Sequence, residues 1–313
     1  MRYPVPNPLI VIVGPTAVGK SRIAIEVSRQ LNGEIISADS RLFYRGMDIG
    51  TAKPSDEDRR KINHHLIDIA DPDEVMSLRI FQEKAQDCIK EIIDRDKLPI
   101  LVGGTGQYIH SVTEGWIIPP QKPDDKMRDL LNEWANEIGS EEIHQKLFLL
   151  DPVAAKKIDP RNVRRTIRAL EVILGTGKLF SLQKSRERPK YYLKMIGLSL
   201  PREILYQRID ERINQMISDG LIDEVKILLS KGYSSDLPSM SAIGYREIAD
   251  YLENKITYDD AIMLMKRRTR QFVRRQANWF KFNDPHIHWF VVSTRIVEEI
   301  TKFIQSADDW IIE

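Results

Sequence analysis

The chain has 313 residues, of which 42% are hydrophobic and 30% charged, and 47 basic side chains nearly cancel 46 acidic ones. This composition is typical of one large or two modest globular domains, and it excludes general disorder and fibrous repeats. The single cysteine, Cys88, cannot form an internal disulfide or a multi-cysteine zinc site. No apolar stretch approaches the ~20 residues of a membrane span, and the proline-rich start resembles no signal or transit peptide. We therefore expect a cytoplasmic protein without a membrane partner.

The first predicted strand is the apolar, β-branched run at 9–13, which is typical of a strand buried on both faces of a parallel sheet. A helix is predicted over 20–31, because apolar residues recur at helical spacing and Asn32-Gly33 is a stop signal. Further strands are predicted at 34–37, 65–69, 99–102, 191–198 and 288–292. Strands that alternate with helices predict an α/β fold with a mostly parallel sheet, whose ligands bind at the carboxyl ends of the strands.

The alternation stops between 116 and 189, where helical patterns continue without a convincing strand. Asp151-Pro152 and Asp159-Pro160 each fit an N-cap followed by a proline in the first helical turn. We therefore predict a discontinuous core, 1–115 together with 190–313, interrupted by an all-helical insertion at 116–189.

The segment 14–21 matches the P-loop pattern of glycine, four residues, glycine, lysine and serine or threonine. It consists of Gly14, Pro15, Thr16, Ala17, Val18, Gly19, Lys20 and Ser21, between a predicted strand and a predicted helix. Backbone N–H groups at a helix N-terminus attract oxyanions, Lys20 adds a charge, and the Ser21 hydroxyl can hold Mg²⁺. The motif predicts a P-loop NTPase-like core that binds a di- or triphosphate. The central strand at 99–102 lacks a following carboxylate and Asp68 is a weaker candidate, so nucleotide hydrolysis is poorly supported.

Two further loops should meet the P-loop at the same edge of the sheet. Asp39 follows the second predicted strand, where it could act as a general base, ligate a metal, or simply cap a helix. Residues 103–106, with three glycines, follow the strand at 99–102. These glycines either permit a tight turn or allow a ligand to approach closely.

Two segments concentrate positive charge. Arg161, Arg164, Arg165 and Arg168 recur at helical spacing in a helix predicted from Asp159. The segment 266–281 holds seven cations and no acid. Such faces can be plain solvated surface, but like charges at this spacing repel unless a polyanion neutralises them. We therefore favour contact with nucleic acid, and some of these arginines could instead coordinate phosphate in the catalytic site.

In their order and spacing, these motifs resemble the bacterial tRNA dimethylallyltransferases, the isopentenyl-transferase (IPP transferase) family. The resemblance runs from Leu9 to about Phe282. It rests on GPTAVGKS at 14–21, ISADSRLFYRGMDIGTAKP at 36–54, LVGGTGQY at 101–108, IGYRE at 243–247 and TRQFVRRQANWF at 269–280. It implies dimethylallyl diphosphate as donor, Mg²⁺ as cofactor, and as acceptor the exocyclic amine of the adenosine immediately 3′ of the anticodon in tRNA.

The resemblance also implies roles for single residues. Asp39 would accept the proton of the amine, and Thr16, Lys20 and Arg212 would assist the diphosphate, with Arg208 as the alternative to Arg212. With the cationic segments, it predicts contacts of a monomer with the tRNA anticodon stem-loop, which the insertion would help to hold. The predicted contacts are Asp39, Ser40, Arg41, Leu42, Thr105, Arg128, Arg161, Arg164, Arg165, Arg168, Gly244, Tyr245, Arg246, Arg270, Arg274, Arg275 and Gln276.

Two alternatives stay open at this point. A P-loop kinase for a small molecule or nucleotide would use the same loop for ATP. A P-loop protein that binds RNA without catalysis would not need Asp39.

Overall fold

The computed structural model describes residues 5–118, 124–182, 190–308 and 310. The structure divides into two compact units, one combining Met1–Thr113 with Pro189–Glu313 and the other comprising Glu114–Arg188. The first unit is thus assembled from two stretches of sequence that the second unit separates. No helix in these ranges is both long and apolar enough to cross a membrane.

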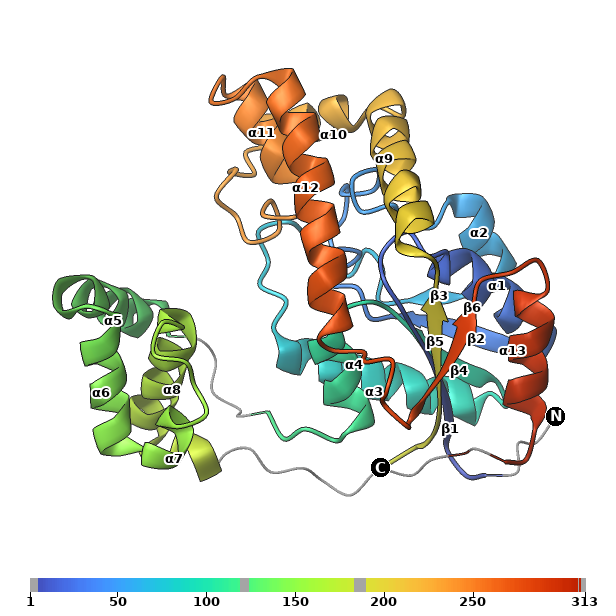
Figure 1. Ribbon diagram of the computed structural model, residues 1–313, viewed down its shortest axis with the longest axis horizontal. Helices are drawn as coiled ribbons and strands as arrows, with labels where there is room; N and C mark the ends of the chain where they lie inside the picture. The colour runs from blue at the N-terminus through green and yellow to red at the C-terminus, as the bar shows by residue number, and fades with distance from the viewer. Residues whose placement is uncertain (1–4, 119–123, 183–189, 309, 311–313) are drawn as a thin grey trace. The chain divides into compact units, whose positions relative to one another are not determined.

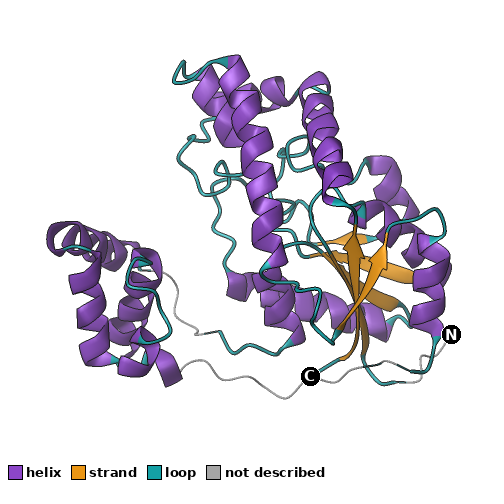
Figure 2. Ribbon diagram, viewed as in Figure 1, coloured by secondary structure: helices purple, strands orange, loops and turns teal. Residues whose placement is uncertain are grey.

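A six-stranded sheet runs through the first unit (Figure 2). Its strands are β1 (Pro8–Val13), β2 (Gly33–Ser37), β3 (His64–His65), β4 (Leu98–Val102), β5 (Tyr192–Ser199) and β6 (Ile287–Val291). They stand in the order β3-β2-β4-β1-β5-β6, and every neighbouring pair is parallel. β1 lies in the middle, and its apolar residues 9–13 are wholly buried, as expected for a central parallel strand.

The predicted strand at 65–69 is wrong after its first residue, because β3 covers only His64–His65. Asp68 has a left-handed backbone φ of 57°, which a strand cannot include. Its carboxylate instead accepts hydrogen bonds from Lys53 at 2.5 Å and Arg59 at 2.7 Å. Asp68 is therefore held in an ion-pair network and does not supply the aspartate that a nucleotide-hydrolysing site requires.

Helices cover both faces of the sheet (Figure 1). On one side lie α1 (Lys20–Leu31) and α13 (Ile296–Gln305), and on the other α3 (Leu78–Asp94) and α4 (Gly106–Thr113), while α2 (Asp56–Lys61) is short. α1 begins directly after the P-loop glycine. It ends at Asn32 with a left-handed φ of 51°, as the predicted stop signal requires.

Four more helices follow β5 and precede β6 in the sequence. They pack together beyond the carboxyl ends of the strands (Figure 1). They are α9 (Arg202–Ser218), α10 (Leu221–Ser230), α11 (Tyr245–Leu252) and α12 (Tyr258–Ala277). α12 packs against α9 and α11, and its Ala261 and Met265 are buried. Because the strands are parallel, the segments after β1, β2, β4 and β5 all begin at the edge that this bundle covers.

The second unit has a hydrophobic core of its own, built by residues such as Leu131, Leu147 and Leu170. Its elements are α5 (Asp125–Ile138), α6 (Ser140–Leu150), α7 (Pro152–Ala155), α8 (Val163–Thr176) and the 3-10 helix η1 (Phe180–Leu182). Asp151 caps α7 ahead of Pro152, as predicted. The pair at 159–160 does not start a helix, because the Asn162 side chain caps α8 instead.

Candidate active site

The P-loop is a tight turn between β1 and α1. Gly14 lies so close to β5 that a Cβ atom there would come within 2.7 Å of the Leu198 carbonyl oxygen. Ala17 and Gly19 have left-handed φ values of 64° and 103°. For an alanine this conformation costs roughly 1–2 kcal/mol. Left-handed residues among right-handed ones turn successive N–H groups inward, which is the backbone arrangement of anion-binding nests.

Lys20 folds back onto this turn. Its Nζ donates hydrogen bonds to the carbonyl oxygens of Gly14 and Pro15, both at 2.9 Å. Burial lowers the pKa of Lys20 from 10.5 to about 8, with Asp39 opposing this lowering and Arg212 adding to it. The three charged side chains therefore lie close enough to influence one another.

Arg208 and Arg212 both reach the site from α9. Burial lowers the pKa of Arg212, and the negative charge of Asp39 opposes the lowering. Arg212 donates to the Thr51 carbonyl oxygen at 3.5 Å, whereas Arg208 donates to the Val18 carbonyl oxygen of the P-loop at 3.5 Å. The structure thus brings both predicted alternatives to the site, Arg212 beside Asp39 and Arg208 beside the P-loop.

Asp39 begins a turn rather than a helix. Its Oδ1 accepts the backbone N–H of Arg41 at 3.0 Å, and its carbonyl oxygen accepts that of Leu42 at 3.2 Å. Oδ2 has no hydrogen-bond partner within the described ranges. One carboxylate oxygen is thus fixed by the backbone, and the other is available to a ligand.

Two residues of this loop that are predicted to contact RNA make contacts within the protein. Nη1 of Arg41 donates to the Pro238 carbonyl oxygen at 2.8 Å, and Nη2 donates to Ser241 Oγ at 3.2 Å. Leu42 is buried. Within 39–42, the half-buried Asp39 and Ser40 are the residues whose side chains are not engaged in this way, and the RNA contacts of the segment stay predictions.

The segment at 48–49, which follows the Asp39 turn in the sequence, is held by Glu224. No pattern in the sequence points to this role. Glu224 of α10 accepts the backbone N–H groups of Asp48 at 3.0 Å and Ile49 at 2.8 Å, and also the hydroxyl of Tyr245. Tyr245 is fully buried, and burial raises its pKa, as does the carboxylate beside it. The Tyr245 side chain therefore supports the segment at 48–49 from inside the protein, and the predicted RNA contact at Tyr245 stays a prediction.

The neighbours of Tyr245 differ in their exposure. Gly244 is buried, and its N–H donates to Glu247 at 2.7 Å at the start of α11. Arg246 is exposed and has no partner in the part of the chain that the structure describes. Only Arg246 of this predicted segment is therefore free to meet RNA.

The glycines at 103–106 are approached closely by side chains of the protein itself. A Cβ atom at Gly104 would lie 2.0 Å from Nε2 of Gln276, and one at Gly106 would lie 2.2 Å from the Trp279 ring. Gln276 is only 4% exposed, and its Nε2 donates to the Gly104 carbonyl oxygen at 3.1 Å. The Gln276 side chain is thus engaged within the protein, whereas Thr105 is half-buried, and both RNA contacts stay predictions.

The donor groups at the P-loop fit Mg²⁺ bound together with a phosphate chain. Ser21 lies in the first turn of α1, where its side chain is exposed and forms no hydrogen bond to any described residue. No three His, Cys, Asp or Glu side chains gather as a metal cluster in the described ranges. Mg²⁺ commonly takes one or two protein oxygens and completes its shell with substrate phosphates and water. Ser21 suits such a site.

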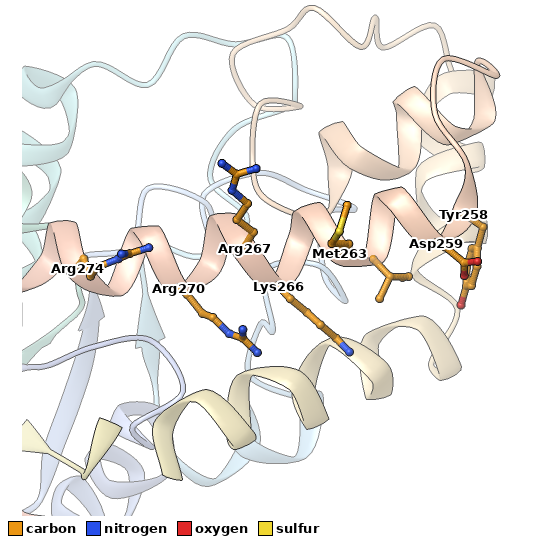
Figure 3. Close-up of a pocket in the computed structure, with 8 residues that line it drawn as sticks. Tyr258, Asp259, Met263, Lys266, Arg267, Arg270 and Arg274 are labelled. Carbon is orange, nitrogen blue, oxygen red and sulfur yellow. The ribbon is translucent and has the colours of Figure 1, made fainter. Parts of the chain in front are cut away.

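A groove of about 560 Å³ runs along α12 (Figure 3). Its lining includes four cations, Lys266, Arg267, Arg270 and Arg274, and one acid, Asp259. Arg270 is bound to Asp210 of α9 at 2.6 Å, but the other three cations have no ion-pair partner among the described residues. Arg275 is also exposed, and its guanidinium lies 5.8 Å from the centre of the Phe272 ring. Uncompensated charges of one sign favour a polyanion in this groove.

The arginines of the second unit do not form one free face. Arg161 precedes α8 and pairs with Asp159 at 2.8 Å. Arg164 and Arg165 are exposed and have no partner in the described ranges. These two are the arginines of α8 that remain available to RNA, because Arg168 pairs within the unit.

Arg128 and Arg168 together hold a buried carboxylate. Both donate to Glu171 Oε2, at 2.9 and 2.8 Å, and Glu171 is fully buried. We expect Arg128→Ala to destabilise the second unit by about 1–2 kcal/mol, a value reduced for the partial exposure of the arginine. Urea denaturation measures this, and the exposed Arg164→Ala serves as control with a change below about 0.5 kcal/mol. Weaker RNA binding at unchanged stability would instead make Arg128 a direct contact.

The P-loop, two arginines and a carboxylate lie at one sheet edge, which is the arrangement typical of P-loop proteins and one that favours a phosphate chain. The model of the IPP transferase family matches residues 42–283. The chain therefore belongs to the IPP transferase family, and the predicted resemblance is confirmed.

Named relatives and solved structures agree with this assignment. The chain is 52% identical to a tRNA dimethylallyltransferase of Roseiflexus sp. (strain RS-1), over 88% of this chain and 90% of the relative. It resembles the crystal structure of the full-length tRNA isopentenylpyrophosphate transferase from Bacillus halodurans, with a TM-score of 0.73 and 43% identity over 96% and 97% of the two chains. A structure of a eukaryotic dimethylallyltransferase acting on tRNA matches with a TM-score of 0.79 and 30% identity, over 92% of this chain and 74% of that one.

Proposed function

We propose that the protein transfers the dimethylallyl group of dimethylallyl diphosphate to the exocyclic amine of the adenosine immediately 3′ of the anticodon in tRNA. The products are N6-isopentenyladenosine and diphosphate. The observation that carries this proposal is the placement of Asp39 beside Lys20 and Arg212 at the P-loop edge. A base for the amine and a cradle for the leaving group are thereby adjacent. The family, and relatives named for this activity, support the same reaction.

The reaction forms a carbon–nitrogen bond at the first allyl carbon and breaks the carbon–oxygen bond to the diphosphate. The adenine amine is a weak nucleophile, because its lone pair is delocalised into the ring, and Asp39 accepts its proton. Lys20, Arg212, the Thr16 hydroxyl and the P-loop N–H groups stabilise the charge of the departing diphosphate. No water is activated, which agrees with a glycine, Gly103, directly after β4.

In this proposal the Ser21 hydroxyl would hold Mg²⁺ together with the diphosphate, and the bound cation would supply neutralisation of charge on the leaving group. We place the reaction in the cytoplasm, since a lone cysteine is typical of a reducing compartment, and we propose that the protein acts as a monomer.

A transfer assay tests the function directly. Purified protein, Mg²⁺ and labelled dimethylallyl diphosphate are incubated with unmodified tRNA, and label in the tRNA is the expected result. ATP with small acceptors forms the second arm, because a P-loop kinase would use the same loop. Consumption of ATP without transfer of label to tRNA would overturn the proposal.

The free cations of the α12 groove should carry part of the RNA affinity. Replacing Lys266, Arg267 and Arg274 by glutamine removes three possible phosphate contacts. We expect the slope of log affinity against log salt to fall by about 2, since each phosphate contact contributes ~0.7–0.9. Filter binding over a salt series measures this, with Lys302→Gln, whose lysine pairs with Glu298, as control. An unchanged slope would place the RNA elsewhere.

A further inference from the structure

Gln276 links three parts of the first unit through one amide. Its Oε1 accepts the backbone N–H of Thr16 at 2.9 Å, and its Nε2 donates to the Gly104 carbonyl oxygen at 3.1 Å. The side chain is 4% exposed and comes from the last turn of α12. A single buried side chain therefore ties the P-loop, the loop after β4 and the end of α12 together.

The P-loop needs contacts that keep its shape. Ala17, next to Thr16, has a left-handed φ of 64°, and such strained backbone persists only where its surroundings hold it. Lys20 and Arg208 also hold the loop, through the Gly14, Pro15 and Val18 carbonyl oxygens. Both are cations, so an incoming diphosphate competes with the loop carbonyls for them. The neutral amide of Gln276 has no such attraction to the anion, and its hydrogen bonds can persist when the site is filled.

We propose that Gln276 is a positioning residue, which holds the P-loop in its diphosphate-binding shape through Thr16 and Gly104 and does not contact RNA. The inference deepens the proposed function and rests on it for the identity of the donor. Because Gln276 holds the phosphate-binding loop, the binding of inorganic pyrophosphate tests this role without any transfer reaction.

Gln276→Met provides the first test, because methionine fills a similar volume but forms neither hydrogen bond. We expect inorganic pyrophosphate with Mg²⁺ to bind about tenfold more weakly by calorimetry, as the loss of a buried hydrogen bond implies. The KM for dimethylallyl diphosphate should rise by a similar factor, and the Kd for tRNA should stay within about twofold. Weaker tRNA binding with unchanged pyrophosphate affinity would overturn the proposal. Failure of prenyl transfer in the unmodified protein would overturn the proposed function. The pyrophosphate titration would still test the role of Gln276, because it requires no transfer.

Gly104→Ala provides the second test, because its Cβ atom would lie 2.0 Å from Nε2 of Gln276 and displace the amide. We expect Gly104→Ala to weaken pyrophosphate binding as much as Gln276→Ala does. The double variant should bind no more weakly than Gln276→Ala, since the truncated side chain no longer collides. Additive losses in the double variant would contradict the proposal. Gln271→Ala, at an exposed glutamine on the same helix, is the matched control and should leave the pyrophosphate affinity unchanged.

Discussion

Asp39→Asn should nearly abolish prenyl transfer while both substrates still bind. Asparagine keeps the shape of the side chain, and its Oδ1 can still accept the Arg41 N–H, so the turn persists. The amide cannot take up the proton of the adenine amine. Loss of a general base costs ~10²–10⁴-fold in rate. We expect single-turnover transfer to fall by about 10³-fold, with the Kd for tRNA within about threefold.

A matched control separates this effect from a general loss of negative charge. Asp87 is exposed on α3, and Asp87→Asn should transfer at the rate of the unmodified protein. The removal of the Asp39 charge also removes a contact that favours the charged form of Lys20. Transfer is therefore measured at pH 6 as well as at pH 7, because a lower pH favours the charged form of Lys20. A near-normal rate of transfer for Asp39→Asn would exclude Asp39 as the base.

The parts of the fold that were predictable are those that local sequence determines. The runs at 9–13 and 99–102 are short and apolar, because central parallel strands are buried on both faces. The run at 34–37 is also buried, although Glu34 and Ser37 are polar. The P-loop was equally predictable, since eight consecutive residues carry both the turn and its charges. The length of β3 was overestimated, because the apolar residues after His65 suggest that the strand continues to residue 69. Asp68 has a left-handed backbone and pairs with Lys53, a contact with another segment that the local pattern does not reveal.

The partners of the cations were not predictable from charge patterning. Arg270 looks free in a cationic segment, yet it pairs with Asp210, which lies 60 residues earlier. Gln276 stands among arginines and so suggests an RNA contact, but its amide reaches Thr16 across 260 residues of sequence. Arg168 pairs with Glu171, which lies three residues later in the same helix. A run of cations thus predicts the sign of a surface, whereas the fold decides which cations remain free.

Diphosphate binding should weaken above about pH 8, because Lys20 loses its charge there. Burial lowers the pKa of Lys20 to about 8, so the side chain is charged below that pH and neutral above it. A bound anion favours the charged form, so binding above pH 8 takes up a proton. The effect on stability has the opposite sign. Between pH 8 and 10.5 the unfolded chain holds more protons at Lys20 than the folded one, so this residue favours folding more as the pH rises.

Calorimetric titration with inorganic pyrophosphate and Mg²⁺ from pH 7 to 9.5 measures this dependence. We expect the affinity of the unmodified protein to fall by up to about tenfold per pH unit above pH 8. Lys20→Arg keeps its charge throughout, so it should show only the decline that pyrophosphate itself and other groups cause. Lys20→Met should bind ~10–100-fold more weakly already at pH 7, as the loss of a charge-assisted hydrogen bond implies. Identical pH profiles for the unmodified protein and Lys20→Arg would show that the Lys20 charge does not hold the diphosphate.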